Sequence, residues 1–410
     1  MEFRPILSAL LRNKFAPLLV AMQVAISLAV MANALHIVSL RYAAATRPSG
    51  IADEQNVFTI RVQPLKPPSF AELMAQQQRD KDVLRALPGV ISVASANQFP
   101  MSQSGWNSSV AASRNQTQPT GTAGRYNTAD SLIKTMGLQL IEGRDFTPAD
   151  VEEVDFDAAD SKNDKVIITK ALAEALYPGA SSVVGRPMFF GIDADAQETH
   201  IIGVVQGLQT PGAANGIKGE YSTIEPIRSA SPAGAYVVRA EPGQLERVAR
   251  DAEAALRKAR SYPVLMKSNS FEEYRSIRYR DDRTLAWMLV AVSALLLLIT
   301  ASGIVGMTSL WISQRRKQIG VRRALGARRI DILRYFVTEN LVITSGGVVA
   351  GMVLAMALNQ ILVSQLELTR LPLGYPAGGG VLLWFLGVLA VLGPARRASR
   401  ITPATATRAA

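Results

Sequence analysis

The 410-residue sequence contains no cysteine and only two histidines, His36 and His200. The lack of cysteine excludes disulfides, thiolate metal sites and cysteine nucleophiles, and two histidines leave almost nothing for a zinc site or a Ser-His catalytic arrangement. A phosphate-binding P-loop is also missing, because neither Gly-Lys-Ser nor Gly-Lys-Thr occurs and Gly216-Ile217-Lys218-Gly219 lacks the required spacing. We therefore expect a chain that is not itself an enzyme and binds no metal or cofactor.

Acidic residues are scarce outside one long segment. Residues 41–283 carry 28 of the 44 Lys+Arg and 29 of the 33 Asp+Glu, which leaves 16 basic and 4 acidic residues for the flanks. A nucleic-acid-binding protein usually spreads its excess cations over a folded face. Here the cations border apolar segments, so we expect no nucleic-acid partner and interpret the charge as a signal of membrane topology.

Four stretches are apolar and long enough to cross a bilayer core of about 30 Å, which takes about 20 helical residues. We expect transmembrane helices at residues 16–40, 284–312, 341–362 and 377–393. A cleaved signal peptide is the alternative for the first stretch, but about 25 apolar residues exceed the roughly 7–15 of a signal sequence. Asn33 and His36, one turn apart in that stretch, are expected to pack at a helix interface rather than to relay protons.

Lysine and arginine in short flanks orient the spans. Both termini and the loop between the second and third spans are expected to be cytoplasmic, because the outer link 367–375 holds only Arg370. The expected order is an N-terminal segment at 1–15, an extracytoplasmic domain at 41–283, a cytoplasmic loop at 313–340, an outer loop at 363–376 and a cytoplasmic tail at 394–410. The flanking cations are Arg4, Arg12, Lys14, Arg315, Arg316, Lys317, Arg322, Arg323, Arg328, Arg329, Arg334, Arg396, Arg397, Arg400 and Arg408.

The extracytoplasmic segment shows the same local pattern at both ends. Residues 57–62 alternate as a half-buried strand, Ser69-Phe70-Ala71-Glu72 is a capping box that begins a helix ended by Pro88-Gly89, and residues 90–93 predict a second strand. Near the other end, a strand at 235–238, a helix at 242–260 and a strand at 263–266 repeat this order. Two β-α-β units around an insertion at about 120–225 predict a split α/β sandwich with a second subdomain.

The insertion is less regular. We expect helices at 129–136 and before Tyr177-Pro178-Gly179, strands at 166–169 and 201–205, and a mobile loop in the Ser/Gln/Thr/Asn-rich stretch 102–122. An acidic run at 142–164 is either a Ca²⁺ or cationic-ligand site or a solvated loop. The loop is favoured, because the run lacks EF-hand order and a glycine pivot.

Two further patterns concern the spans. Ser270-Phe271-Glu272-Glu273 caps a helix that we expect to run through Tyr279 into the second span as one stiff rod. Small residues are expected to allow close helix packing. They are Ser302, Gly303 and Gly306 on the second span and Gly346, Gly347 and Gly351 on the third.

Residues 311–336 alternate apolar side chains with arginine and lysine. This pattern indicates a short amphipathic helix along the membrane face, with Gly326-Ala327 as a hinge before the third span. A helix that only binds anionic lipids is the alternative.

The segment Arg316-Lys317-Gln318-Ile319-Gly320-Val321-Arg322-Arg323-Ala324-Leu325-Gly326-Ala327-Arg328-Arg329-Ile330-Asp331-Ile332-Leu333 closely resembles the signature of MacB/FtsX-type ABC transporter permeases. The tail Gly393-Pro394-Ala395-Arg396-Arg397-Ala398-Ser399-Arg400-Ile401-Thr402-Pro403-Ala404 and the motifs Glu142-Gly143-Arg144-Asp145-Phe146 and Leu176-Tyr177-Pro178-Gly179 are similar to that family too. Gln318 departs from the acidic residue usual in the family.

The resemblance implies an extracytoplasmic domain of Porter-like and Sabre-like parts, a bacterial inner-membrane location and a second permease chain in a homodimer or heterodimer. It also implies a separate cytoplasmic ABC ATPase that binds ATP and Mg²⁺, membrane lipids around the spans and, in some systems, a periplasmic adaptor. The implied contacts with the ATPase are Gln318, Ile319, Gly320, Val321, Arg322, Arg323, Ala324, Leu325, Gly326 and Ala327.

The function implied by the resemblance is that of a stand-alone permease subunit which passes ATP-driven motion to its periplasmic domain. The motion would serve export of a periplasmic substrate such as an antibiotic, a peptide or a lipid-like molecule. An FtsX-like regulator that activates a cell-wall hydrolase without transport is the second hypothesis. A membrane-anchored extracytoplasmic enzyme is a third, which the missing catalytic constellation disfavours.

Overall fold

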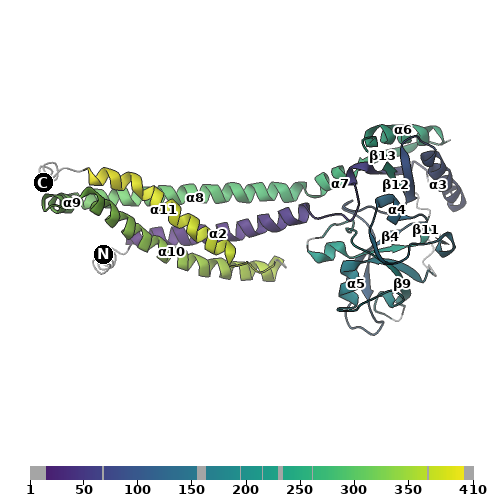
Figure 1. Cartoon of the computed structure of the whole chain (residues 1–410), viewed down its shortest axis with the longest axis horizontal. Coiled ribbons are helices and arrows are strands. Elements are labelled where there is room, and N and C mark those ends of the chain that lie inside the picture. Colours follow the sequence, from purple (N-terminus) through teal and green to yellow (C-terminus); the bar gives the residue numbers. More distant parts are fainter. Residues whose placement is uncertain are drawn as a thin grey trace. The chain divides into compact units, whose positions relative to one another are not determined.

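The structure, a computed structural model, describes residues 15–66, 69–154, 163–193, 195–214, 216–229, 234–260, 262–366 and 369–400. The expected N-terminal segment 1–15 lies almost wholly outside this part of the chain, as do residues 155–162 of the acidic run and the tail beyond 400. The chain divides into two compact units, residues 1–43 with 282–410, and residues 44–281 (Figure 1).

The first unit contains four long apolar helices, α2 (Phe15–Ala45), α8 (Arg280–Gln314), α10 (Arg329–Leu366) and α11 (Gly374–Ser399). By length and composition, each could cross a membrane. Each contains one of the predicted apolar stretches and extends beyond it, and α11 includes Pro394. The prediction of four apolar helices with an α/β domain is therefore confirmed.

Helix α2 packs against each of the other three. The Ser27 and Thr300 hydroxyls lie 2.8 Å apart and join α2 to α8. A Cβ atom placed on Gly351 would lie 2.9 Å from the Ala25 carbonyl oxygen, and one on Gly379 would lie 2.7 Å from Leu28. The buried core of this unit includes Val24, Leu28, Ile304, Phe336, Ile343, Leu383 and Val391.

The second unit begins and ends in a four-stranded antiparallel sheet with strand order β13-β1-β12-β2. The strands are β1 (Val57–Pro64), β2 (Val90–Ser95), β12 (Gly234–Ala240) and β13 (Val264–Ser270). Helices α3 (Phe70–Arg85) and α6 (Leu245–Lys258) cover one face (Figure 1), where Phe58, Ile60, Val238 and Leu256 are buried. The two predicted β-α-β units are thus present and pair into one sheet.

Helix α3 begins at the predicted capping box. The Glu72 carboxylate accepts hydrogen bonds from the Ser69 backbone N–H over 2.9 Å and from its hydroxyl over 2.7 Å. These two bonds satisfy donors that the start of a helix would otherwise leave unpaired. The boundary of α3 is therefore set locally, by residues adjacent in the sequence.

Between the halves of this sheet the chain forms an inserted subdomain with strand order β5-β9-β7-β10-β4-β3-β8. An additional pairing of β8 with β9 closes six of these strands into a ring, which removes most of its free edges. The strands are β3 (Asn107–Ala111), β4 (Gly121–Asn127), β5 (Leu140–Gly143), β7 (Lys165–Thr169), β8 (Pro187–Phe190), β9 (Gln197–Val205) and β10 (Ser222–Glu225). Short helices α4 (Leu132–Met136) and α5 (Lys170–Leu176) and the strand pair β6 (Glu152–Val154) with β11 (Ile227–Ser229) complete it.

Two sequence predictions about this unit are wrong. Part of the stretch 102–122, expected to be a mobile loop, forms β3, because Val110 and Ala111 pair with β8 and are buried. The expected continuous rod is interrupted, because α7 ends at Arg278 and α8 begins at Arg280. Tyr279 between them is buried in the core of the second unit. Among the described residues of the acidic run no group of three or more possible metal ligands gathers, and Asp150 pairs with Arg144 and Lys165 instead.

Candidate functional site

A short helix, α9 (Arg316–Ala324), joins α8 to α10 and contains most of the segment predicted to contact an ATPase. Its C-terminal end is closed by two backbone hydrogen bonds, from Gly326 N–H to the Arg323 carbonyl and from Ala327 N–H to the Arg322 carbonyl. This bonding pattern requires a left-handed residue, and Gly326 has φ +98°. The predicted hinge at Gly326-Ala327 is therefore a tight helix end that reverses the chain.

The next helix begins only a few residues later. The Asp331 carboxylate accepts a hydrogen bond of 2.9 Å from the Arg328 backbone N–H in the first turn of α10. A negative charge is favourable at this end of a helix because it meets the positive end of the helix dipole. The short turn and this cap hold α9 next to the start of α10.

One face of α9 packs against the four-helix unit. Ile319 is buried with Ile332 and Phe336 of α10, and Gly320 is also buried. The Arg322 guanidinium lies 5.2 Å from the centre of the Tyr335 ring. A small pocket remains between the two helices, lined by Arg315, Gln318, Ile319, Arg322, Ile332, Tyr335 and Phe336.

Two arginines form hydrogen bonds from the α9 region to α10 and α11. Arg315, between α8 and α9, donates to both carboxylate oxygens of Glu339 and lies 3.2 Å from the Tyr335 hydroxyl. Arg323 donates to the Ser399 carbonyl at the end of α11. Helix α9 is thus bonded at both ends to the helices that could span a membrane.

The opposite face of α9 is open. Val321 is 52% exposed and Leu325 is 84% exposed, so two apolar side chains lie on the surface among cations. Of the ten predicted contact residues, Ile319 and Gly320 face inward and Arg323 and Ala327 are half-buried. The remaining six, Gln318, Val321, Arg322, Ala324, Leu325 and Gly326, are exposed. Such a surface can accept a partner without disturbing the buried face.

The predicted small-residue positions fall into two groups. Cβ atoms added to Gly303 and Gly347 would lie 2.4 Å from the Gln23 side chain and 2.7 Å from the Ala21 carbonyl oxygen, so these two glycines allow α8 and α10 to approach α2 closely, as Gly351 also does. By contrast, Cβ atoms on Gly306 and Gly346 would meet no atom of another element within 4 Å among the described residues, and Ser302 is exposed.

Asn33 and His36 lie at helix contacts. The Asn33 amide donates to the Ala355 carbonyl of α10 over 3.0 Å. His36 lies 3.3 Å from the Thr369 carbonyl oxygen, and its ring is tilted against that of Tyr375. Both side chains are buried, which fits interface packing.

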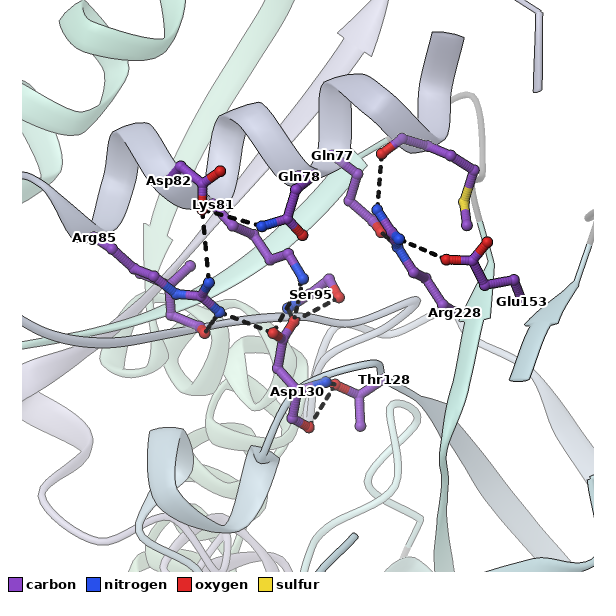
Figure 2. A network of polar contacts seen from close by, with 12 residues as sticks. Gln77, Gln78, Lys81, Asp82, Arg85, Ser95, Thr128, Asp130, Glu153 and Arg228 are labelled. Atoms are coloured by element: carbon purple, nitrogen blue, oxygen red, sulfur yellow. Dashed lines mark hydrogen bonds and ion pairs between the residues drawn. The ribbon is translucent and has the colours of Figure 1, made fainter. Parts of the chain in front are cut away.

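A polar network that sequence reasoning missed links α3 to the inserted subdomain. Asp130, which precedes α4, accepts hydrogen bonds from Lys81 over 3.0 Å, from Arg85 over 2.9 Å and from the Ser95 backbone N–H over 3.0 Å (Figure 2). Burial alone would raise the pKa of the Asp130 carboxyl, but the Lys81 charge and the Ser95 hydrogen bonds outweigh it and lower that pKa. The side chains come from residues 49 and 45 positions away, so no local pattern announces them.

A second contact lies further along the same helix. Arg228 of β11 donates to the Glu153 carboxylate over 2.6 Å, to the Gln77 side chain over 3.0 Å and to the Met74 carbonyl over 2.9 Å (Figure 2). Together, Asp130 and Arg228 hold α3 to the inserted subdomain at two separate points.

Two family models match most of the chain. One described as "MacB-like periplasmic core domain" matches residues 20–255, and one described as "FtsX-like permease C-terminal" matches residues 290–403. The chain belongs to the MacB/FtsX-type ABC transporter permease family. In this MacB/FtsX permease, α9 lies within the second match and the α3 network within the first.

Two bacterial export ATP-binding/permease proteins resemble parts of this permease. The pyoverdine export ATP-binding/permease protein PvdT of Pseudomonas syringae pv. tomato is 34% identical over 127 residues, which are 31% of this chain and 19% of PvdT. The macrolide export ATP-binding/permease protein MacB of Bordetella avium is 25% identical over 286 residues, 66% of this chain and 40% of that protein. The permease thus spans less than half of the length of each of these two relatives.

Two solved structures are similar to part of the chain. The extracellular domain of the ABC-type transporter YknZ from Gram-positive bacteria covers 52% of this chain at 18% identity and a TM-score of 0.33. A domain of a putative permease protein from Porphyromonas gingivalis covers 54% at 13% identity and a TM-score of 0.34. At these TM-scores the family assignment rests on the sequence matches alone.

Proposed function

We propose that this chain is a permease subunit that passes ATP-driven motion of a separate cytoplasmic ATPase to its extracytoplasmic domain, for export of a periplasmic substrate. The two faces of α9 are the observation that carries the proposal. One face is bonded to α10 and α11 through Arg315 and Arg323, while Val321 and Leu325 on the other face are free to contact a partner.

The orientation follows from charge. Because cations crowd the ends of the apolar helices around α9 and after α11, we propose that these ends lie in the cytoplasm. We propose that residues 44–281, whose charge is nearly balanced, lie on the other side of the bacterial inner membrane. An ATPase would then act on α9 from the side where ATP is available.

The coupling itself needs no chemistry in this chain. When ATPase subunits that hold ATP and Mg²⁺ close, α9 would move with them and displace α8, α10 and α11. The Arg315–Glu339 ion pair resists separation of α9 from α10, since breaking it would leave a buried carboxylate unpaired. A second permease chain, identical or not, would cover part of the exposed apolar surface of the spans, membrane lipids would cover the rest, and a periplasmic adaptor could receive the outer domain.

The names of the relatives support export. PvdT and MacB are named for export of pyoverdine and of macrolides, and both carry an ATP-binding part. We therefore place the substrate among antibiotics, peptides and lipid-like molecules. The match of residues 290–403 to the FtsX-like model keeps a regulator of a periplasmic hydrolase as the second candidate.

The test is co-purification with the ATPase from membranes of cells that express the full chain. Leu325→Glu adds a charge to the open face of α9 without touching its buried face, and it should abolish recovery of the ATPase and the ATP turnover that depends on it. Leu265→Glu, at a leucine that is 61% exposed on β13, is the matched control and should retain both. Equal recovery of the ATPase with both variants would mean that the ATPase contacts another part of the chain. Co-purification of a periplasmic hydrolase, with no exported substrate, would favour the regulator.

A further inference from the structure

Helix α7 (Phe271–Arg278) is the last element of the second unit before the chain enters α8. Its N-terminus is capped by the Ser270 hydroxyl, which accepts from the Glu273 backbone N–H over 3.1 Å. Phe271 and Tyr274 are buried, and the Tyr274 hydroxyl lies 3.1 Å from that of Thr59 on β1. This side of α7 is therefore fixed to the four-stranded sheet.

Arg275 connects α7 to the segment that follows α2. Its Nη1 donates to the Ala45 carbonyl over 3.0 Å and to the Arg47 carbonyl over 2.9 Å, and its Nη2 donates to Glu54 over 2.6 Å. The two places where the chain enters and leaves residues 44–281 are thus bonded to each other by one side chain.

Arg278 connects α7 to a different part of the domain. Its Nε donates to the Gly212 carbonyl over 2.8 Å and its Nη2 to the Ala213 carbonyl over 2.9 Å. Arg47 adds a hydrogen bond of 3.3 Å to the next carbonyl, that of Ala214. Three consecutive carbonyls of one loop therefore accept bonds from two arginines.

This loop stands between β9 and β10, which flank β7 in the inserted subdomain. It is held in a costly conformation, because Ala213 has φ +43° although it is not glycine. A second residue with positive φ, Gln103 at +68°, donates from its side chain to the Ile277 carbonyl of α7 over 3.4 Å. Positive φ values at residues other than glycine persist only where surrounding contacts hold the backbone in place.

We propose that Arg278 is a positioning residue that makes the inserted subdomain follow α7, and that Tyr274 does the same for the four-stranded sheet. These separate connections matter only if motion reaches residues 44–281 through the membrane-spanning helices, so the proposal rests on the proposed function. A planar guanidinium can bond two adjacent carbonyls at once, whereas a lysine ammonium on a flexible stem holds them less firmly.

The experiment measures distances by double electron–electron resonance in the purified full chain. Because the chain has no cysteine, spin labels can be placed at will. Glu272→Cys on α7 with Glu174→Cys on α5 reports on the inserted subdomain, and Glu272→Cys with Gln78→Cys on α3 reports on the four-stranded layer. All three positions are exposed.

In the Arg278→Gln background we expect the first distance distribution to broaden and shift while the second stays narrow. Arg278→Lys should fall between Gln and wild type. Arg247→Gln is the matched control, since Arg247 also donates to a carbonyl, that of Pro88, away from α7, and it should change neither distribution. An unchanged first distribution in Arg278→Gln would overturn the proposal, and broadening of both would overturn it too, because Arg278 would then stabilise the whole domain. No ATPase is needed, so this result stands apart from the test of the proposed function.

Discussion

Arg315 donates hydrogen bonds from one nitrogen, Nη1, to both carboxylate oxygens of Glu339, over 2.9 and 3.2 Å. Glu339 is only 1% exposed, and Arg315 is the one cation within ion-pair distance of it among the described residues. The pair joins the end of α8 to the body of α10 across 24 residues of sequence. It fixes the angle at which the chain enters α9.

Removing one member of this pair should destabilise the helical unit. Glu339→Gln leaves Arg315 without its counter-charge, and we expect a loss of about 2 kcal/mol, below the roughly 3–5 of a fully buried pair because Arg315 is partly exposed. The double variant Arg315→Met with Glu339→Met should recover most of the loss, since no charge is then left unpaired. Unfolding of the purified chain in increasing SDS measures both, and wild-type stability of the Gln variant would contradict the role given to the pair.

Two adjacent glycines of α10 should respond differently to alanine. In Gly347→Ala the added Cβ would lie 2.7 Å from the Ala21 carbonyl oxygen, so α2 and α10 must separate, at a cost of about 1–3 kcal/mol. In Gly346→Ala the Cβ would meet no other element in the described part of the chain, so stability should stay equal or rise by up to about 1 kcal/mol from helix propensity. The same unfolding assay compares the pair, and equal effects would show that α2 does not pack there.

The low pKa of the Asp150 carboxyl leads to a prediction about how the stability of the second unit depends on pH. Hydrogen bonds from the Arg144 and Lys165 side chains and from Thr147 hold the pKa of its carboxyl well below the usual value. A group whose pKa is depressed by folding contributes stability above its unfolded pKa, about 3.9 for aspartate, and loses this contribution as pH falls further. Wild-type stability should therefore lose this contribution below about pH 4.

The variant Asp150→Asn tests this dependence. It should be less stable than wild type at pH 7, and the difference between the two should shrink as the pH is lowered to 3. Thermal unfolding followed by circular dichroism at several pH values measures the difference. Glu174→Gln, at an exposed position, serves as the control, and a constant difference between Asp150→Asn and wild type would contradict the assignment.

The elements that the sequence predicted are those with local causes. The apolar stretches, the capping box at Ser69 and the alternation at residues 57–62 all act through neighbours in the chain. Strand β3 was missed because three of its five residues are polar. Asn107, Ser108 and Ser109 pair with β4, while Val110 and Ala111 pair with β8, and only the tertiary fold brings these strands close. The interruption at Tyr279 was missed for a similar reason, since the side chain of Tyr279 is buried in the core of the second unit.

The candidate site divides in the same way. The position of α9 and the glycine that ends it could be predicted, because amphipathic spacing and a left-handed helix end are sequence features. The hydrogen bonds that hold α9 to the other helices could not be predicted. Arg323 is 76 residues from Ser399, and the sequence does not show which of the many arginines in this segment makes the bond. Asp130 likewise gave no signal, since an isolated aspartate near a helix start is common in sequences, and Lys81 and Arg85 approach it only in the folded chain.

The proposed function requires α9 and the domain of residues 44–281 to lie on opposite sides of a membrane. Single cysteines at Leu325 and Glu174, both exposed, allow a direct measurement with a membrane-impermeant maleimide. In cells whose outer membrane is permeabilised and whose inner membrane is intact, we expect the Glu174→Cys variant to be labelled and the Leu325→Cys variant to be protected. In inverted inner-membrane vesicles we expect the reverse. Labelling of both variants from the same side would contradict the account.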